Sequence, residues 1–153
     1  MIMKKIMFVC HGNICRSPMA EFVFKKMIEE RGLEEKYRVS SCATSREEIG
    51  NPVYPPARAE LRRHGINPDG KYSVQIEKSD YPMYDLFVCM DSRNVTNALR
   101  ILGDDPENKL CKLMDYTSRG GDVADPWYTG VFDVTYRDIY EGCEALLATL
   151  ENE

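Results

Sequence analysis

The sequence predicts an α/β fold: a single doubly wound domain, residues 1–153, with a parallel sheet of about four strands and helices on both faces. Short apolar runs without polar alternation predict strands that are buried on both faces. Each run is followed by apolar residues at helical spacing, so strands and helices alternate along the chain. The length of 153 residues suits one domain of ordinary size.

The first half of the chain predicts two strands and two helices. Lys5–Cys10 is a continuous apolar run and predicts the first strand. Ser17 and the proline after it predict the cap and first position of a helix that continues to Gly32. Tyr37–Cys42 predicts the second strand. A turn-rich surface loop follows, and residues 57–65 then predict a short helix.

The second half predicts two more strands, each leading toward a helix. Tyr84–Met90 is a buried strand candidate, and either Asp91 or Ser92 is expected to cap the helix after it. Lys109–Met114 is a weaker fourth strand. Residues 139–150 carry apolar side chains at helical spacing and predict a helix that packs on the sheet.

Composition excludes several classes of protein. The chain has 20 Lys and Arg against 25 Asp and Glu, a net charge of −5, so we expect no general attraction to nucleic acid or to an anionic membrane. No stretch has the pattern of a signal peptide or the length of a membrane span. The six cysteines are scattered, which favours reduced thiols in the cytoplasm. With two histidines and no Cys-x-x-Cys pair, a structural zinc site is not expected.

The segment between the first strand and the first helix predicts an anion site. Amides of such a loop and the helix N-terminus attract a phosphate, and Gly12 and Asn13 tolerate the backbone angles that turn amides inward. Arg16 can close the loop with a planar fork of donors. The same field stabilises a thiolate, so Cys10 is expected to be nucleophilic near neutral pH, with the Ser17 hydroxyl donating to its sulfur.

A thiolate beneath a bound phosphoryl group is arranged for in-line attack, which gives a cysteinyl-phosphate and requires an acid for the leaving group. Asp125, in the long polar loop 115–130, is the candidate acid. An Asp-Pro pair alone is more often a plain turn, and only the Cys-x5-Arg motif favours the catalytic interpretation. Trp127 and Tyr128 are interpreted either as packing residues or as walls of an aryl-binding slot.

Three motifs resemble the low-molecular-weight protein tyrosine phosphatases: "VCHGNICRSPMAE" at residues 9–21, "CMD" at 89–91 and "DPWY" at 125–128. The likeness extends over nearly the whole chain. It implies metal-independent hydrolysis of phosphotyrosine in proteins on a flavodoxin-like fold, with no cofactor. It also suggests a monomer, with a tyrosine kinase as a possible substrate protein.

By this resemblance Cys10 is the nucleophile, Arg16 binds the phosphate, and Asp125 is the acid and then the base for the attacking water. Residues that form or support the phosphate loop are His11, Gly12, Asn13, Ile14, Cys15, Ser17 and Ser41. Residues of the substrate pocket are Glu47, Trp127 and Tyr128. From the residues alone, His11 is an ordinary loop residue; by the resemblance it borders the pocket. Cys15 matches a cysteine that forms a reversible disulfide with the nucleophile.

The chain also departs from the family pattern. The family often has glycine where Cys42 stands, an aromatic residue near Glu47, and near Gly70 a histidine that completes the network of the asparagine and serine.

Alternatives remain on the same fold. A protein arginine phosphatase usually has threonine in place of Ile14, and a thioredoxin-coupled arsenate reductase needs a downstream redox pair, of which only Cys89 is present, since Thr96 stands at the partner's position. Two further alternatives come from a different functional class. A phosphocysteine carrier of the sugar phosphotransferase type would not need Arg16 or Asp125. A phosphotyrosine-binding module without a working acid would bind and not turn over.

Overall fold

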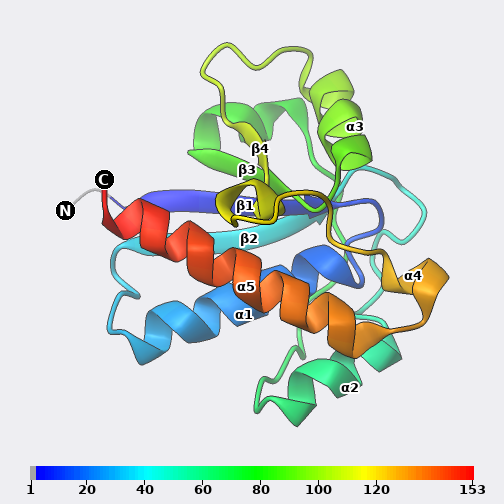
Figure 1. Ribbon diagram of the computed structural model, residues 1–153. Helices are drawn as coiled ribbons and strands as arrows, with labels where there is room; N and C mark the ends of the chain where they lie inside the picture. The colour runs from blue at the N-terminus through cyan, green and yellow to red at the C-terminus, as the bar shows by residue number, and fades with distance from the viewer. Residues whose placement is uncertain (1–2) are drawn as a thin grey trace.

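The computed structural model describes residues 3–153 and contains one sheet of four parallel strands (Figure 1). The strands are β1 (Lys4–Cys10), β2 (Tyr37–Ala43), β3 (Leu86–Cys89) and β4 (Leu110–Lys112), in the order β2-β1-β3-β4. β1 lies opposite β2 along its whole length, from the pair Lys4 and Tyr37 to the pair Cys10 and Ala43. The predicted four-stranded parallel sheet is confirmed.

Helices cover both faces of the sheet, which confirms the doubly wound architecture (Figure 1). The α-helices are α1 (Arg16–Glu30), α2 (Pro55–Arg63), α3 (Ser92–Leu102), α4 (Pro126–Thr129) and α5 (Phe132–Glu151). Two 3₁₀ helices, η1 (Lys78–Met83) and η2 (Leu113–Tyr116), complete the described elements. α1 and α5 pack together on one face, and α3 with η1 covers the other. None of the helices within residues 3–153 is long and apolar enough to cross a membrane.

β1 is buried on both faces, which explains its continuous apolar run. Successive side chains of a strand point to opposite faces. Ile6 and Phe8 therefore pack in the core under α1 and α5, whereas Met7 and Val9 pack under α3. All four are at most 4% exposed. The central strand thus leads from the middle of the core directly to Cys10 at its carboxyl end.

α5 packs closely against η2 at Gly142. A Cβ atom added to this glycine would lie 2.5 Å from Cγ of Leu113, so any larger residue would push α5 away from η2. The close contact holds α5 against the start of η2, and the chain after η2 carries Asp125.

The start of α1 differs from the prediction. Ser17 does not cap this helix: it lies inside the first turn, and Cys15 occupies the capping position without a side-chain hydrogen bond. The reason is chemical, because the Ser17 hydroxyl lies 3.0 Å from Cys10 Sγ and is engaged there. At α3 the prediction holds, since the Asp91 carboxylate accepts from the amide of Asn94 and caps the helix.

Other boundaries shift by a few residues, and α5 begins at Phe132, seven residues before the predicted start at residue 139. α2 begins at Pro55 rather than at residue 57, and β4 ends at Lys112 because the chain turns into η2. The predicted loop 115–130 contains the short helix α4.

Candidate active site

Cys10 lies at the carboxyl end of β1 and begins a loop that enters α1. Its side chain is almost fully buried, at 3% exposure. The backbone amide of Asn13 donates to Cys10 Sγ at 3.2 Å, and Ser17 Oγ lies 3.0 Å from the same sulfur. Asn13 has a φ of 58°, the left-handed conformation that turns the loop over the sulfur. The first turn of α1 adds amides without intrahelical partners, so the loop concentrates donors around one thiol.

A buried hydrogen-bond network holds this loop conformation. The side-chain amide of Asn13 donates to Ser17 Oγ at 2.7 Å and to Ser41 Oγ at 2.9 Å. Its carbonyl oxygen accepts from the amide of Val74 at 3.2 Å. Because Ser17 Oγ accepts from Asn13, its own proton is free to point toward Cys10 Sγ, or toward the carbonyl of Cys42 at 3.3 Å.

The network continues to a buried ion pair that the sequence alone did not indicate. Ser41 Oγ donates to Glu21 Oε1 at 2.6 Å, and Lys71 Nζ lies 3.7 Å from that oxygen. Lys71 also donates to the carbonyl of Ser41 at 2.7 Å. Burial lowers the pKa of Lys71, and the neighbouring Glu21 carboxylate works against this. Lys71 and Glu21 therefore support the loop in this chain, beside Gly70, near which the family often has a histidine.

Lys71→Met is expected to lower both stability and turnover. The change leaves Glu21 buried with Lys25 as its remaining cation, at 2.5 Å, and we expect a loss of about 1 to 3 kcal/mol of unfolding free energy. Turnover should fall several-fold because the carbonyl of Ser41 loses its hydrogen bond from Lys71. The check is thermal unfolding and steady-state rates, with Glu21→Gln combined with Lys71→Met as the matched variant. That double variant should recover part of the stability, and an unchanged melting temperature in Lys71→Met would contradict the role of the pair.

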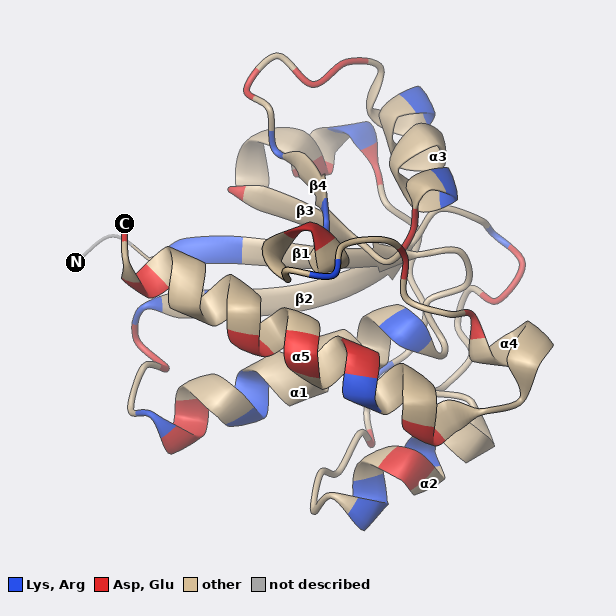
Figure 2. Cartoon of the chain, viewed as in Figure 1, with Lys and Arg blue, Asp and Glu red and all other residues tan. Residues whose placement is uncertain are grey.

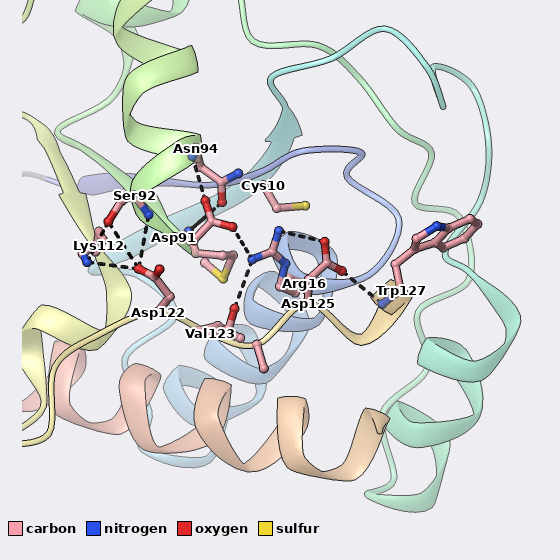
Figure 3. Close-up of polar contacts among 12 residues, drawn as sticks. Cys10, Arg16, Asp91, Ser92, Asn94, Lys112, Asp122, Val123, Asp125 and Trp127 are labelled. Atoms are coloured by element: carbon pink, nitrogen blue, oxygen red, sulfur yellow. Dashed lines mark hydrogen bonds and ion pairs between the residues drawn. The ribbon is translucent and has the colours of Figure 1, made fainter. Parts of the chain in front are cut away.

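Arg16 lies at the base of the site between two carboxylates (Figure 3). Its guanidinium donates to Asp91 Oδ2 at 2.7 Å, to the carbonyl of Val123 at 3.1 Å and to Asp125 Oδ2 at 3.4 Å. Burial alone would lower the pKa of Arg16, but Cys10, Asp91 and Asp125 outweigh it and raise the pKa. The group therefore stays charged although it is 3% exposed.

Hydrogen bonds hold the chain segment before Asp125 against the ends of β3 and β4 and the start of α3 (Figure 3). Asp122 Oδ1 accepts from the amide of Ser92 at 3.2 Å and from Lys112 Nζ at 3.0 Å. The next residue, Val123, is buried, and its amide donates to the carbonyl of Met90 at 2.9 Å. Asp125 then caps α4 by accepting from the amide of Trp127 at 3.1 Å. These contacts fix the Asp125 carboxylate beside Arg16.

A cavity of about 220 Å³ opens above Cys10 and Arg16. Its other lining residues are His11, Gly12, Ile14, Cys15, Glu47, Glu48, Asp125, Trp127 and Tyr128. Trp127 and Tyr128 are 55% and 83% exposed, so they lie at the mouth of the cavity rather than in the core. Tyr54 packs against Trp127 with ring centroids 5.0 Å apart. The arrangement is a thiol and a guanidinium at the bottom, a carboxylate at the side and aromatic rings at the rim.

Comparison with known proteins identifies the family. The model of the low molecular weight phosphotyrosine protein phosphatase family matches residues 5–153. This chain belongs to that family. It is 37% identical to the low molecular weight protein-tyrosine-phosphatase YfkJ of Bacillus subtilis over 153 residues, 99% of this chain and 98% of that protein. It is 36% identical to the low molecular weight phosphotyrosine protein phosphatase of Homo sapiens, over 94% of each chain. The crystal structure of YfkJ matches with a TM-score of 0.95 at 36% identity, and covers 99% of this chain and 97% of that one.

In this member of the phosphatase family, the predicted site residues divide into two groups. Those that line the cavity are Cys10, His11, Gly12, Ile14, Cys15, Arg16, Glu47, Asp125, Trp127 and Tyr128. Asn13, Ser17 and Ser41 lie behind the loop and support it from the protein interior. His11 does not point away as an ordinary loop residue would: its Nε2 lies 3.0 Å from Glu47 Oε2.

Other contributors were not predicted as site residues. Lys71, Asp122 and Tyr54 are far from the motif in sequence, and only the fold brings them to it. Glu21 is the last residue of the motif, but its contact with Ser41 could not be read from the sequence. Asp91 could have been predicted as a site residue from the sequence, because it follows β3 at the same sheet edge as Cys10. Within residues 3–153, no three His, Cys, Asp or Glu side chains gather in a way that would hold a metal ion.

Most other cysteines of this phosphatase-family chain are buried thiols. Burial raises the pKa of Cys42 and of Cys89 well above the usual value, and the pKa of Cys111 to about 11. Among the described cysteines, Cys10 and Cys15 alone line the cavity. Burial, with the nearby Cys10 and Asp125, raises the pKa of Cys15 to about 12, so Cys15 is a thiol at neutral pH.

Proposed function

We propose that this protein hydrolyses phosphotyrosine in proteins through a cysteinyl-phosphate intermediate. The observation that carries the proposal is the shared cavity of Cys10, Arg16 and Asp125, with the sulfur held by the Asn13 amide at 3.2 Å and the Ser17 hydroxyl at 3.0 Å. The names of the relatives, which are tyrosine phosphatases, support the same substrate class.

In the first step Cys10 Sγ attacks phosphorus from the bottom of the cavity, and the bond to the tyrosine oxygen breaks on the opposite side. Arg16 and the loop amides bind the equatorial oxygens, whose charge they stabilise throughout the step. Asp125 protonates the departing phenolate oxygen. One N–H group of Arg16 donates to Asp125 Oδ2 at 3.4 Å. A bound phosphate would accept from this N–H group in place of Asp125.

In the second step a water attacks the cysteinyl-phosphate from the side that the tyrosine has left. Asp125, now a carboxylate, accepts a proton from this water, and the thiolate of Cys10 leaves as inorganic phosphate forms. The Ser17 hydroxyl and the Asn13 amide stabilise the charge that returns to the sulfur. No step requires a metal ion.

Two alternatives on the same fold are less well supported. An arsenate reductase needs further accessible thiols, but Cys89 is buried in β3 at 0% exposure. An arginine phosphatase usually has the smaller threonine at position 14 of the loop. In this chain Ile14 occupies that position and lines the cavity. The tyrosine side chain suits the aromatic rim formed by Trp127 and Tyr128.

Phosphate release from a phosphotyrosine peptide, without metal and with a chelator present, tests the proposal. A phosphoarginine peptide and arsenate with thioredoxin are run beside it. We expect turnover of phosphotyrosine to exceed that of both competitors. If the protein does not hydrolyse phosphotyrosine but turns over phosphoarginine or arsenate, it has the corresponding alternative activity instead.

Redox control of Cys10 is a further part of the proposal. Peroxide converts a thiolate to a sulfenic acid, and the Cys15 thiol can displace water from it to form a disulfide that a thiol reductant reverses. After mild peroxide, wild type should recover its activity with dithiothreitol, whereas Cys15→Ser should recover much less. Equal recovery of the two proteins would exclude this protection.

The substrate protein and the oligomeric state stay predictions. A tyrosine kinase is the proposed phosphoprotein substrate, and the chain is expected to act as a monomer. Both follow from the family resemblance. Turnover of a phosphorylated kinase domain and the mass in solution would test them separately.

A further inference from the structure

The mouth of the active-site cavity has two chemically different walls. Trp127 and Tyr128 line it from α4, and Glu47 and Glu48 line it from the loop that follows β2. Figure 2 shows the acidic stretch of this loop on the same side of the molecule as α4, beyond the ends of the strands. The tyrosine ring can therefore contact the aromatic wall, while the peptide on either side of it passes the glutamates.

Contacts within the protein hold both glutamates at this place. Glu47 Oε2 lies 3.0 Å from His11 Nε2, a pairing that neutralises the carboxylate only when the ring is protonated. Glu48 Oε2 accepts from Asn51 Nδ2 at 2.5 Å. Glu48 also covers the phosphate loop, since a Cβ atom on Gly12 would lie 3.5 Å from Glu48 Cγ. These contacts place both carboxylates at the rim of the cavity.

The charges that line the cavity do not favour an acidic substrate segment. Among the described lining residues, Arg16 is the one permanent cation, against the carboxylates of Glu47, Glu48 and Asp125. Arg16 is already paired with Asp91 at 2.7 Å. Arg16 and the loop amides bind the phosphate itself, so none of the described lining residues offers a further permanent cation to the peptide beside it. Acidic residues beside the phosphotyrosine would add like charges, and basic residues would neutralise the glutamates.

We infer that Glu47 and Glu48 make this enzyme selective for phosphotyrosines flanked by lysine or arginine. The inference rests on the proposed function and deepens it, because it names the class of substrate segment. Glu47 is largely exposed and Glu48 partly so, so each contact is modest. For the two together we expect about a fivefold preference in kcat/KM for basic over acidic flanks at low ionic strength.

The test uses three phosphotyrosine peptides that differ only in the residues beside the phosphotyrosine: lysine, glutamine or glutamate. Three proteins are compared: wild type, Glu47→Gln with Glu48→Gln, and Glu34→Gln with Glu35→Gln. Glu34 and Glu35 are a matched control, since they are two consecutive exposed glutamates that precede β2 at the opposite end of the sheet from Cys10. Within each protein, kcat/KM is expressed relative to the glutamine peptide, so a general loss of activity cancels.

Wild type and the control should prefer lysine flanks about fivefold over glutamate flanks, and about 0.5 M salt should remove most of the preference. The Glu47 and Glu48 double variant should show little preference. A preference that survives in this variant, or that is absent from wild type, would overturn the inference while the proposed function stands. No turnover of any phosphotyrosine peptide by wild type would overturn the proposed function, and this inference with it.

Discussion

Cys10→Ser is expected to reduce phosphotyrosine turnover by about 10⁴-fold or more, the largest effect of any single substitution in this chain. A serine hydroxyl is a far weaker nucleophile than a thiolate, and the adjacent His11 is not placed to activate it, because its Nε2 lies 3.0 Å from Glu47 Oε2. Initial rates on a phosphotyrosine peptide and on a small aryl phosphate measure the loss.

The anion site should survive this substitution. Arg16 and the loop amides are unchanged, so vanadate or phosphate should still protect Cys10→Ser against thermal unfolding. Cys111→Ser is the matched control, since Cys111 lies on β4 outside the cavity and should keep near-normal rates. Near-normal turnover by Cys10→Ser would remove Cys10 from the nucleophile role, and loss of anion protection would show that the loop itself had collapsed.

Local signals predicted most of the sheet and its helices. The run Lys5–Cys10 had to be buried on both faces because it lacked any polar alternation, and β1 is indeed the central part of both cores. Misplaced boundaries have local causes as well. Ser-Pro resembles a cap, but at Ser17 the hydroxyl is used by the sulfur of Cys10. α4 has four residues, too few for any periodicity, although Asp125, Pro126 and Gly130 mark its two ends.

The site was predictable where its parts lie within one loop. Cys10 and Arg16 are six positions apart on a strand-to-helix turn, so their proximity follows from the sequence. Glu21 and Lys71 are fifty positions apart, and a glutamate among the apolar residues of α1 gives no sign of a distant lysine. Such pairs depend on how the loops after β2 return to the sheet edge, which no local pattern specifies.

Asp125→Ala is expected to lower kcat/KM for phosphotyrosine by about 100-fold or more, and much less for para-nitrophenyl phosphate. The phenol of tyrosine is a poor leaving group and needs a proton as the bond breaks, whereas nitrophenolate is a stable anion that leaves without one. The choice of kcat/KM rather than kcat matters, because Asp125 also serves as base in the second step. That step is the same for every substrate. kcat/KM reports only the steps up to departure of the phenol, so it isolates the acid role.

Alanine at position 125 also removes the cap of α4 and the contact with Arg16. Asp125→Asn separates these effects, because its amide oxygen can still accept from Trp127 while it can no longer supply a carboxylic proton. Asp133→Asn, in the first turn of α5 and outside the cavity, is the control for a lost carboxylate. If Asp125 is the acid, Asn and Ala should share the same dependence on the leaving group and Asp133→Asn should not show it. Equal losses on both substrates in Asp125→Asn would mean that the proton comes from elsewhere and that Asp125 only positions Arg16 and α4.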